Sequence, residues 1–410
     1  MDQHQSGSGL LTINAGSSSI KFSLFLLPQL NQIVAGQVDG IGGDASFKIK
    51  LSNQGSEQTI LWDTDLKPSN HQEALTCIIK WLHDEFADIE VIAVGHRVVH
   101  GGQHYTQAAI IDDKVMQDLE GLVGLAPLHM PHNLSGIRAA QENFGSVPQI
   151  ACFDTAFHRV HSFVDDCYAI PRSYYEKGVC RYGFHGLSYE YIAEKLMYMF
   201  PLQSRGKVII AHLGNGASMT ALNNGLSIAS TMGFSSLDGL PMGTRCGEID
   251  PGVLLYMMQH ESMDAEDISN LLYKESGLKA LSGGLSNDMR VLESSDSLAA
   301  KEAIQYYVKE VKREIGALTA LLAGLDVLVF TGGIGENSSH IRSEVLQNMS
   351  WLGIELKESN NLAGETIIST DKSRVLCLRL HTDEEQVIAR HAYDLVKINT
   401  VLQWPKLETH

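Results

Sequence analysis

Basic residues are scarce in this chain. Its 410 residues include 31 Lys and Arg against 48 Asp and Glu, which gives a formal net charge of −17 at pH 7. A surface with this balance repels polyanions, which argues against general binding of nucleic acid or of anionic membranes. The balance still allows a local basic pocket, and an anionic substrate would require one.

Long hydrophobic runs and paired cysteine motifs are also missing. The most apolar long stretch, residues 316–333, is broken by Asp326 and several glycines, so it predicts the end of a helix and a buried strand, not a membrane span. The first nine residues contain no Lys or Arg, which predicts no secretory signal. Six cysteines without CxxC spacing indicate reduced thiols. Together these features predict a cytoplasmic protein with no membrane partner.

The chain does contain enough apolar sequence for two domains. Apolar residues make up 44% and charged residues 19%, which is typical of globular proteins, and 410 residues exceed one ordinary core. Helical and strand patterns alternate, which predicts α/β architecture. Helices are predicted at 70–86, with Asn70 as cap, 111–123, with Asp112 or Asp113 as cap, 132–145, 301–324 and 338–349. Strands are predicted at 91–99, 148–154, 207–213 and 326–330.

Three turns rich in glycine and small polar residues interrupt this pattern, at 14–21, 212–218 and 331–337. Such turns expose backbone N–H groups that suit phosphate oxygens, although the first could equally be an ordinary hairpin turn. None fits GxxxxGK(S/T) or GxGxxG, so the P-loop and dinucleotide folds are not supported. The strand–turn–strand layout of 10–25 recurs at 207–222, which predicts two related domains.

Ten motifs occur in a fixed order along the chain. They are INAGSSSIKF, GHRVVHGG, APLH, FDTAFH, YGFHGLS, HLGNGAS, GLPMGTRCG, SNDMR, FTGGIGEN and TDEE. In this order they resemble the acetokinase family of short-chain acyl kinases, over roughly residues 10–395. The resemblance implies two ribonuclease-H-like domains of the acetate and sugar kinase, chaperone and actin superfamily, with an interdomain ATP cleft. It implies an acyl-substrate domain at 1–154, completed by 385–410, and a nucleotide-binding domain at 155–384.

The activity implied by the resemblance is reversible, Mg²⁺-dependent transfer of the ATP γ-phosphoryl group to acetate, giving ADP and acetyl phosphate. Mn²⁺ is an alternative metal, and the family resemblance implies a homodimer. Acetate has a pKa near ~4, so it is already ionised and the difficulty is electrostatic repulsion between two anions. Two alternatives stay open: a propionate kinase, and a non-catalytic nucleotide-sensing protein on the same fold.

Four residues are the candidates for catalysis and acyl binding. Arg97 and Arg245 both stand beside glycines, and either could clamp a carboxylate or phosphoryl group bidentately. The resemblance implies that Arg97 holds the acyl substrate, that Arg245 and His185 stabilise the transferring phosphoryl group, and that Asp154 is the catalytic carboxylate. Because acetate needs little deprotonation, we expect Asp154 to orient Arg97 or metal-bound water; a structural cap is the alternative.

A short acyl tail requires a small apolar pocket. The resemblance implies that Val99, Leu128 and Phe184 line this pocket, with His129 as a second-rank contact. Ser236 stands where the family usually has proline, so we expect a slightly larger or wetter pocket. One methylene discriminates by only about 1–3 kcal/mol. The sequence therefore leaves propionate open as a substrate.

The resemblance also implies a metal site and a nucleotide site. Asn14 and Glu384 correspond to the Mg²⁺ ligands, and both offer the hard oxygen donors that Mg²⁺ prefers; the neighbouring Glu385 is then a helix-start carboxylate. The implied nucleotide-binding residues are Lys21, His212, Leu213, Gly214, Asn215, Gly216, Asp288, Met289, Arg290, Gly333, Ile334, Gly335, Glu336 and Asn337. Asp288 and Arg290 could instead be an ion pair at a helix end.

Three histidines, His96, His100 and His104, recur every four residues and invite a zinc interpretation. Gly101 and Gly102 and the strand-like segment 91–99 break the helical face that this spacing would need. We therefore expect these histidines to be structural.

Overall fold

The structure is a computed structural model that describes residues 7–16, 19–52, 57–60 and 68–402. The chain folds into two compact units. The first comprises Met1–Ala156 and Asp383–His410, and the second comprises Phe157–Thr382. Ser17 and Ser18 of the predicted loop 14–21 lie outside the described residues, as do both ends of the predicted first domain.

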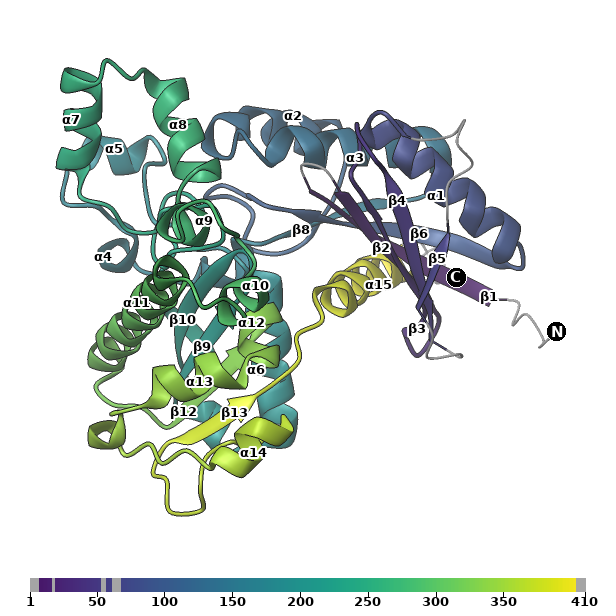
Figure 1. Cartoon of the computed structure of the whole chain (residues 1–410). Helices are drawn as coiled ribbons and strands as arrows, with labels where there is room; N and C mark the ends of the chain where they lie inside the picture. The colour runs from purple at the N-terminus through teal and green to yellow at the C-terminus, as the bar shows by residue number, and fades with distance from the viewer. Residues whose placement is uncertain (1–6, 17–18, 53–56, 61–67, 403–410) are drawn as a thin grey trace. The chain divides into compact units, whose positions relative to one another are not determined.

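The first unit is built on one mixed sheet (Figure 1). Its strands are β1 Gly7–Ala15, β2 Ser19–Leu26, β3 Asn31–Asp39, β4 Ser46–Leu51, β5 Glu57–Ile60, β6 Ile89–Val98, β7 Ala109–Ile110 and β8 Gln149–Phe153. The order is β5-β4-β3-β2-β1-β6-β8-β7. Neighbours from β5 to β1 are antiparallel, whereas β1, β6 and β8 run parallel. The carboxyl ends of β1, β6 and β8 therefore meet at one edge.

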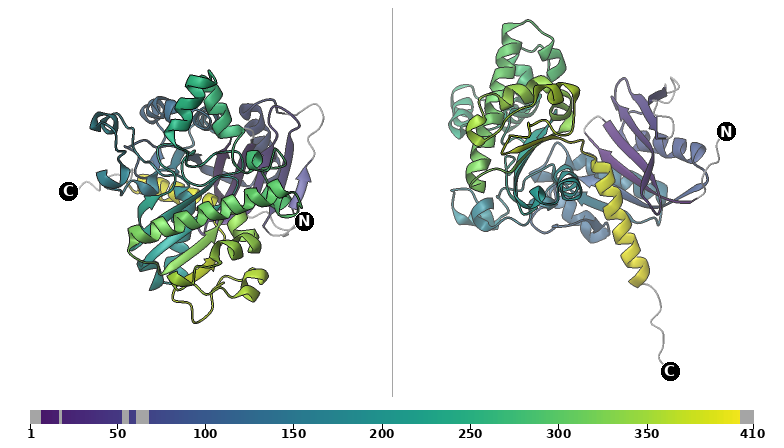
Figure 2. Two further views of the ribbon diagram at one scale, coloured as in Figure 1. Left: turned by 60° about the vertical axis from the view of Figure 1, so that its left-hand side comes forward. Right: turned by 90° about the horizontal axis from the view of Figure 1, so that it is seen from below.

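Helices cover both faces of this sheet because its central strands alternate apolar residues to either side. The helices are α1 His71–Glu85, α2 Asp113–Gly121, η1 Val123–Leu125, α3 Met130–Phe144 and α15 Glu384–Leu402. Leu11 and Val94 join a core with α1 and α3, while Gly95, the next residue of β6, faces Ile388 of α15. Figure 2 shows α15 in yellow along the purple strands. Asn70 caps α1, as predicted, and of the two candidates for α2 the cap is Asp112.

The second unit repeats the central topology of the first. Its strands are β9 Lys207–Leu213, β10 Ala217–Asn223, β11 Leu226–Ser230, β12 Val327–Thr331 and β13 Leu376–Arg379. The order β11-β10-β9-β12-β13 matches β3-β2-β1-β6-β8, with the same antiparallel and parallel neighbours. Because both the strand order and the strand directions repeat, the prediction of two related α/β domains is confirmed.

The helices of the second unit surround this smaller sheet. They are α4 Phe163–Asp166, α5 Arg172–Glu176, α6 Gly186–Met199, η3 Gln203–Arg205, α7 Pro251–His260, α8 Ala265–Lys274, α9 Gly277–Leu281, α10 Met289–Glu293, α11 Leu298–Leu322, α12 Gly332–Asn337, α13 Ser339–Leu346, η4 Ser350–Leu352 and α14 Glu358–Ala363; η2 Ala156–His158 spans the boundary between the units. Val208 and Ile210 of β9 pack with α6, while α11 contacts β9 and β10. Among the described residues, no helix is long and apolar enough to cross a bilayer.

The prediction for 331–337 needs a correction. The segment was expected to be a glycine-rich loop, but its residues from Gly332 form the short helix α12. Gly332 has a φ of 76°, which lets the chain turn sharply out of β12 before the helical turn begins. Glycines lower helix propensity, so the sequence pattern resembles a loop. Packing against the sheet overrides that preference, since α12 lies against β9.

A close approach in the first core gives a stability prediction. Gly36 on β3 stands opposite Phe22, and an added Cβ would overlap the Phe22 ring. That ring is confined by Phe47 and Trp81. We expect Gly36→Ala to lower the free energy of unfolding by about 1–3 kcal/mol, measured by urea unfolding.

Gly121 provides the matched control. It ends α2, and an added Cβ would meet no atom of the described chain within 4 Å. Gly121→Ala should therefore be neutral or stabilise the protein by up to about 1 kcal/mol. Equal stability of Gly36→Ala and wild type would contradict the close packing.

Candidate active site

Arg97 is the centre of a polar cluster in the first unit. Its Nε donates to both carboxylate oxygens of Asp154, at 2.9 and 3.1 Å, and its Nη2 donates to Asp154 Oδ2 at 2.6 Å. Nη1 lies 3.4 Å from Asn14 Oδ1, and Nε lies 3.6 Å from a carboxylate oxygen of Glu384. Asp154 is buried, whereas the Arg97 side chain is 24% exposed, so part of this side chain remains accessible. The structure thus brings together four residues predicted from separate motifs.

The sheet topology explains this convergence. Asn14, Arg97 and Asp154 stand at or just beyond the carboxyl ends of β1, β6 and β8, which are parallel neighbours. Ligand sites in α/β folds typically form at this edge of a sheet. Glu384 is the first residue of α15, which packs on the same strands. The sheet and its covering helix therefore join side chains from both ends of the chain.

The cluster combines one guanidinium with an excess of carboxylates. Burial acts to lower the pKa of Arg97, but the charges of Asp154 and Glu384 more than offset it, and the pKa lies above its usual value. The neighbouring Glu385 has a raised pKa, first because of burial and second because of the Glu384 charge. Arg97 is therefore a permanent cation. Because the carboxylates beside it outnumber this one positive charge, a second cation at the cluster would be stabilised.

Asn133, which was not predicted, holds in place the backbone of the strands that carry this cluster. Asn133 on α3 is buried; its Oδ1 accepts from Val99 N at 3.0 Å, and its Nδ2 donates to Ala15 O at 2.9 Å. It therefore ties together the chain segments that carry Arg97 and Asn14. The sequence did contain a signal, because Asn133 lies one helical turn before the buried Ile137 and is thus a polar residue on a buried face.

The residues predicted for the acyl pocket belong to both units. Val99 directly follows β6 and packs at the edge of the core around Phe153. Leu128 is half-buried before α3, and His129 is the N-cap residue of that helix. Phe184 belongs to the second unit, where its side chain is buried and its carbonyl accepts from His158.

A second polar cluster surrounds His185 in the second unit. His185 is the N-cap residue of α6 in the left-handed region, and its Nδ1 lies 2.8 Å from Ser218 Oγ. Its ring stacks on His212, with ring centroids 4.4 Å apart. Tyr189 shares the Ser218 hydroxyl, and Ser188 hydrogen-bonds His212. These contacts lock the orientation of the His185 ring and leave its Nε2 toward the β9–β10 turn.

Arg245 reaches the same turn. A Cβ on Gly216 would lie 3.3 Å from His185 Nε2 and 4.0 Å from Arg245 Nη1, so both groups face this glycine. Arg245 Nη1 donates to the carbonyl of Ser236 at 3.1 Å. The contact of Ser236 with Arg245 is thus made by its backbone. Gly277 packs against the backbone of Met242 and Arg245. It has a φ of 64°, and a Cβ there would overlap these backbone atoms.

A cavity of about 710 Å³ lies in the second unit. Its lining residues are Gly214, Asn215, Asn287, Asp288, Met289, Arg290, Glu293, Gly333, Ile334, Asn337 and Ser338. Eight of these residues were predicted for the nucleotide, and they come from three separate motifs. Asn287, Glu293 and Ser338 were missed. Asn287 stands inside the SNDMR motif, whereas Glu293 and Ser338, which hydrogen-bond each other, belong to none of the motifs.

The remaining predicted nucleotide residues do not line this cavity. Leu213 and Gly335 are buried, and the Glu336 carboxylate turns back to accept from Gly332 N at 3.0 Å and Thr331 Oγ1 at 3.2 Å. Lys21 is exposed on β2 opposite Asn14, in the first unit. Asp288 caps α10 and pairs with Arg290, so these two both line the cavity and form a helix-end ion pair.

The three spaced histidines have separate environments. His96 is buried and hydrogen-bonds Gln149 at 2.7 Å, and burial lowers its pKa to about 4. His100 accepts from Gly102 N at 2.9 Å, whereas His104 is exposed. Over the described residues, no three His, Cys, Asp or Glu side chains are grouped to hold a metal.

A metal with fewer protein ligands fits the Arg97 cluster better. Asn14 supplies a side-chain carbonyl and Glu384 a carboxylate, and both lie against the same guanidinium. Mg²⁺ typically takes one or two such oxygens and completes its shell with waters and phosphates. The donor set therefore fits Mg²⁺.

Comparison with known proteins identifies the family. A sequence profile of the acetokinase family matches residues 9–390. The chain belongs to the acetokinase family. Acetate kinase of Methylocella silvestris is 50% identical over 395 residues, which cover 94% of this chain and 98% of that protein.

Solved acetokinase-family structures agree in fold. Acetate kinase of Porphyromonas gingivalis is 35% identical with a TM-score of 0.85, and the match covers 95% of this chain and 100% of that one. A propionate kinase from Francisella tularensis is 33% identical with a TM-score of 0.88, covering 94% and 99%. The predicted α/β fold is therefore confirmed as one shared with acetate and propionate kinases.

Proposed function

We propose that this chain is an acetate kinase, which transfers the γ-phosphoryl group of ATP to acetate reversibly. The observation that carries the proposal is the convergence of Arg245 and His185 on Gly216, next to the cavity of about 710 Å³, in a member of the acetokinase family. In this proposal the first unit binds the acyl group and the second unit binds the nucleotide. The bounds of these units differ by only a few residues from those of the predicted domains, 1–154 with 385–410 and 155–384.

The nucleotide would occupy the cavity of the second unit. Gly214 and Gly333 line the cavity and carry no side chains, so phosphate oxygens could approach the backbone closely there. Arg245 and His185 face Gly216 in the same turn, so both can contact the terminal phosphoryl group. The fixed cation of Arg245 would offset negative charge as it develops on the transferring group.

Acetate would bind to the accessible part of Arg97. Asp154 occupies the Nε and Nη2 side of the guanidinium, so the incoming carboxylate would bind at Nη1, which makes a long contact of 3.4 Å to Asn14 Oδ1. Asp154 acts as an orienting group in this scheme, since acetate carries no proton to remove at neutral pH. One acetate oxygen then attacks the γ-phosphorus in line as the bond to the ADP oxygen breaks, and ADP leaves with both electrons of that bond.

Asn14 and Glu384 would hold Mg²⁺, which neutralises phosphate charge when bound. Mn²⁺ has similar oxygen preferences and is the alternative metal. We also propose a cytoplasmic location, which the six cysteine thiols support.

Acetate is preferred over propionate in this proposal because the named relative at 50% identity is an acetate kinase. Propionate kinase stays the second candidate, since a propionate kinase shares this fold at a TM-score of 0.88. Ser236, where proline is usual, is the observation that favours some propionate use.

A hydroxamate assay tests the function directly. With ATP, Mg²⁺ and hydroxylamine as trap, we expect acyl phosphate from acetate, with a higher kcat/KM than from propionate. Chelation by EDTA should abolish product, and Mg²⁺ or Mn²⁺ should restore it. Higher kcat/KM for propionate would overturn the acetate assignment. No product from either acid would favour a non-catalytic nucleotide-sensing protein.

Arg245 gives the sharpest mutational test. Arg245→Ala should lower kcat by roughly 10³ or more, because it removes a fixed cation from the transferring phosphoryl group. Arg313→Ala is the matched control: Arg313 lies on α11 in the same unit and, within the described chain, forms ion pairs with Glu248, Glu310 and Glu314. The control should keep wild-type kcat. Near-normal turnover by Arg245→Ala would remove its assigned role.

We propose that the chain forms a homodimer through α7. All residues of this helix are described and none is buried, although the helix is mostly apolar, and Leu255 and Tyr256 are 55% and 54% exposed. Figure 1 shows α7 standing away from the sheet of its own unit. Single exposed apolar residues are normal, but a whole apolar helix indicates an interface.

Light scattering after size exclusion measures this assembly. The wild type should have twice the chain mass of 45.0 kDa, and Leu255→Asp should shift it toward the monomer. Leu321→Asp, at a 65% exposed site on α11, is the control and should stay dimeric. A dimeric Leu255→Asp, or a monomeric wild type, would rule out α7 as the interface.

A further inference from the structure

Arg342 on α13 is a buried cation with an unusual set of partners. Only 1% of the residue is exposed. Its Nε donates to Asn361 Oδ1 at 2.8 Å, Nη2 to Asn361 O at 2.9 Å, and Nη1 to the carbonyls of Gly335 and Glu336, both at 2.9 Å. Within the described chain, its guanidinium pairs with no carboxylate. All these acceptors are neutral oxygens.

A buried charge of this kind is costly unless its donors are satisfied. Burial, and secondarily the charge of Arg379, lower the pKa of Arg342 to about 10. The guanidinium therefore remains protonated at neutral pH, and the cost is met by charge-assisted hydrogen bonds. A planar fork that donates in several fixed directions is a rigid connector.

The hydrogen bonds of Arg342 join α12 to α14. Gly335 and Glu336 belong to α12, and their neighbours Gly333, Ile334 and Asn337 line the proposed nucleotide cavity. On the other side, Asn361 of α14 is itself fixed, because its Nδ2 donates to Ser339 O at 2.9 Å. Arg342 thus ties α12 to α14 from behind the cavity and does not line it.

We infer that Arg342 is a positioning residue for nucleotide binding, acting through the backbone of α12. This inference rests on the proposed nucleotide site. Glycine-rich α12 packs against β9 with few side chains of its own, so partners that hold its carbonyls contribute to its geometry beside the sheet. Without Arg342, the wall formed by Gly333, Ile334 and Asn337 loses its support, while the Arg97 cluster is untouched.

The test compares nucleotide and acetate parameters. For Arg342→Met, we expect the Kd for ADP, measured calorimetrically with Mg²⁺, and the KM for ATP to rise about tenfold to a hundredfold, the range seen when supporting residues behind a site are lost. The KM for acetate should stay within about twofold of wild type. Arg342→Lys keeps the charge and one direction of donation, and should recover part of the loss.

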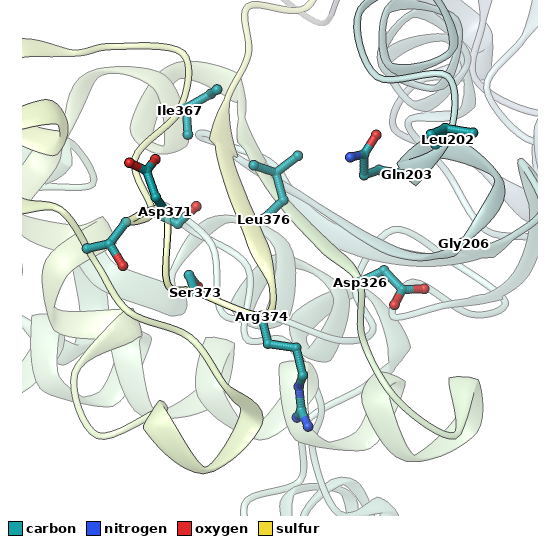
Figure 3. A pocket seen from close by; sticks show the side chains of 11 residues that line it. Leu202, Gln203, Gly206, Asp326, Ile367, Asp371, Ser373, Arg374 and Leu376 are labelled. Carbon is teal, nitrogen blue, oxygen red and sulfur yellow. The ribbon is translucent and has the colours of Figure 1, made fainter.

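Arg374, an exposed arginine of the same unit that also donates to a backbone carbonyl, offers a control outside α12 (Figure 3). Its Nη2 donates to the backbone carbonyl of Leu352 at 2.7 Å, and it borders a cavity of about 500 Å³ that also includes Asp326 and Leu376. That cavity adjoins the starts of β12 and β13, whereas α12 follows the end of β12. Arg374→Met should lower the Tm without changing the Kd for ADP.

Each outcome decides the inference. If Arg342→Met binds ADP as wild type does and only its Tm falls, Arg342 is structural and the inference is wrong. If Arg342→Met does not fold, Asn361→Ala removes the acceptor of Nε and should raise the Kd for ADP in the same direction; an unchanged Kd would overturn the inference. Failure of wild type to bind ADP would overturn the proposed nucleotide site itself.

Discussion

The pairing of Arg97 with Asp154 is the interaction on which the polar cluster of the first unit depends. Asp154 is buried, and three short contacts hold the guanidinium in one orientation. Removing one partner of such a pair typically costs about 3–5 kcal/mol, because the other charge is left buried. In a chain with a net charge of −17, this fixed cation supplies the local positive group that an anionic acid requires.

The repeated sheet explains why both units present functional candidates at the same edge. Three parallel strands end at one edge of each sheet. They are β1, β6 and β8 in the first unit and β9, β12 and β13 in the second. In the first unit these ends carry Asn14, Arg97 and Asp154; in the second, the β9–β10 turn and α12 border the cavity. One topology thus presents a charged cluster in one case and backbone donors in the other.

Arg97 and Arg342 show how different partners suit different roles. Arg97 is paired with a carboxylate and its side chain stays partly accessible, so it can still bind a ligand. Arg342 is enclosed, and four of its five N–H groups already donate to neutral carbonyl oxygens. Burial combined with the identity of the acceptors distinguishes a ligand-binding guanidinium from a positioning one.

The sequence alone determined the α/β class, the family and the helix cap at Asn70, because these depend on local periodicity, short-range hydrogen bonds and ordered motifs. Tertiary structure decided the contacts of Arg97 with Asp154, the helical form of α12, and the supports Asn133 and Arg342. The reason is physical: these contacts join residues through strand register and helix packing, which local patterns do not specify. A buried polar side chain becomes informative only once the acceptors around it are known.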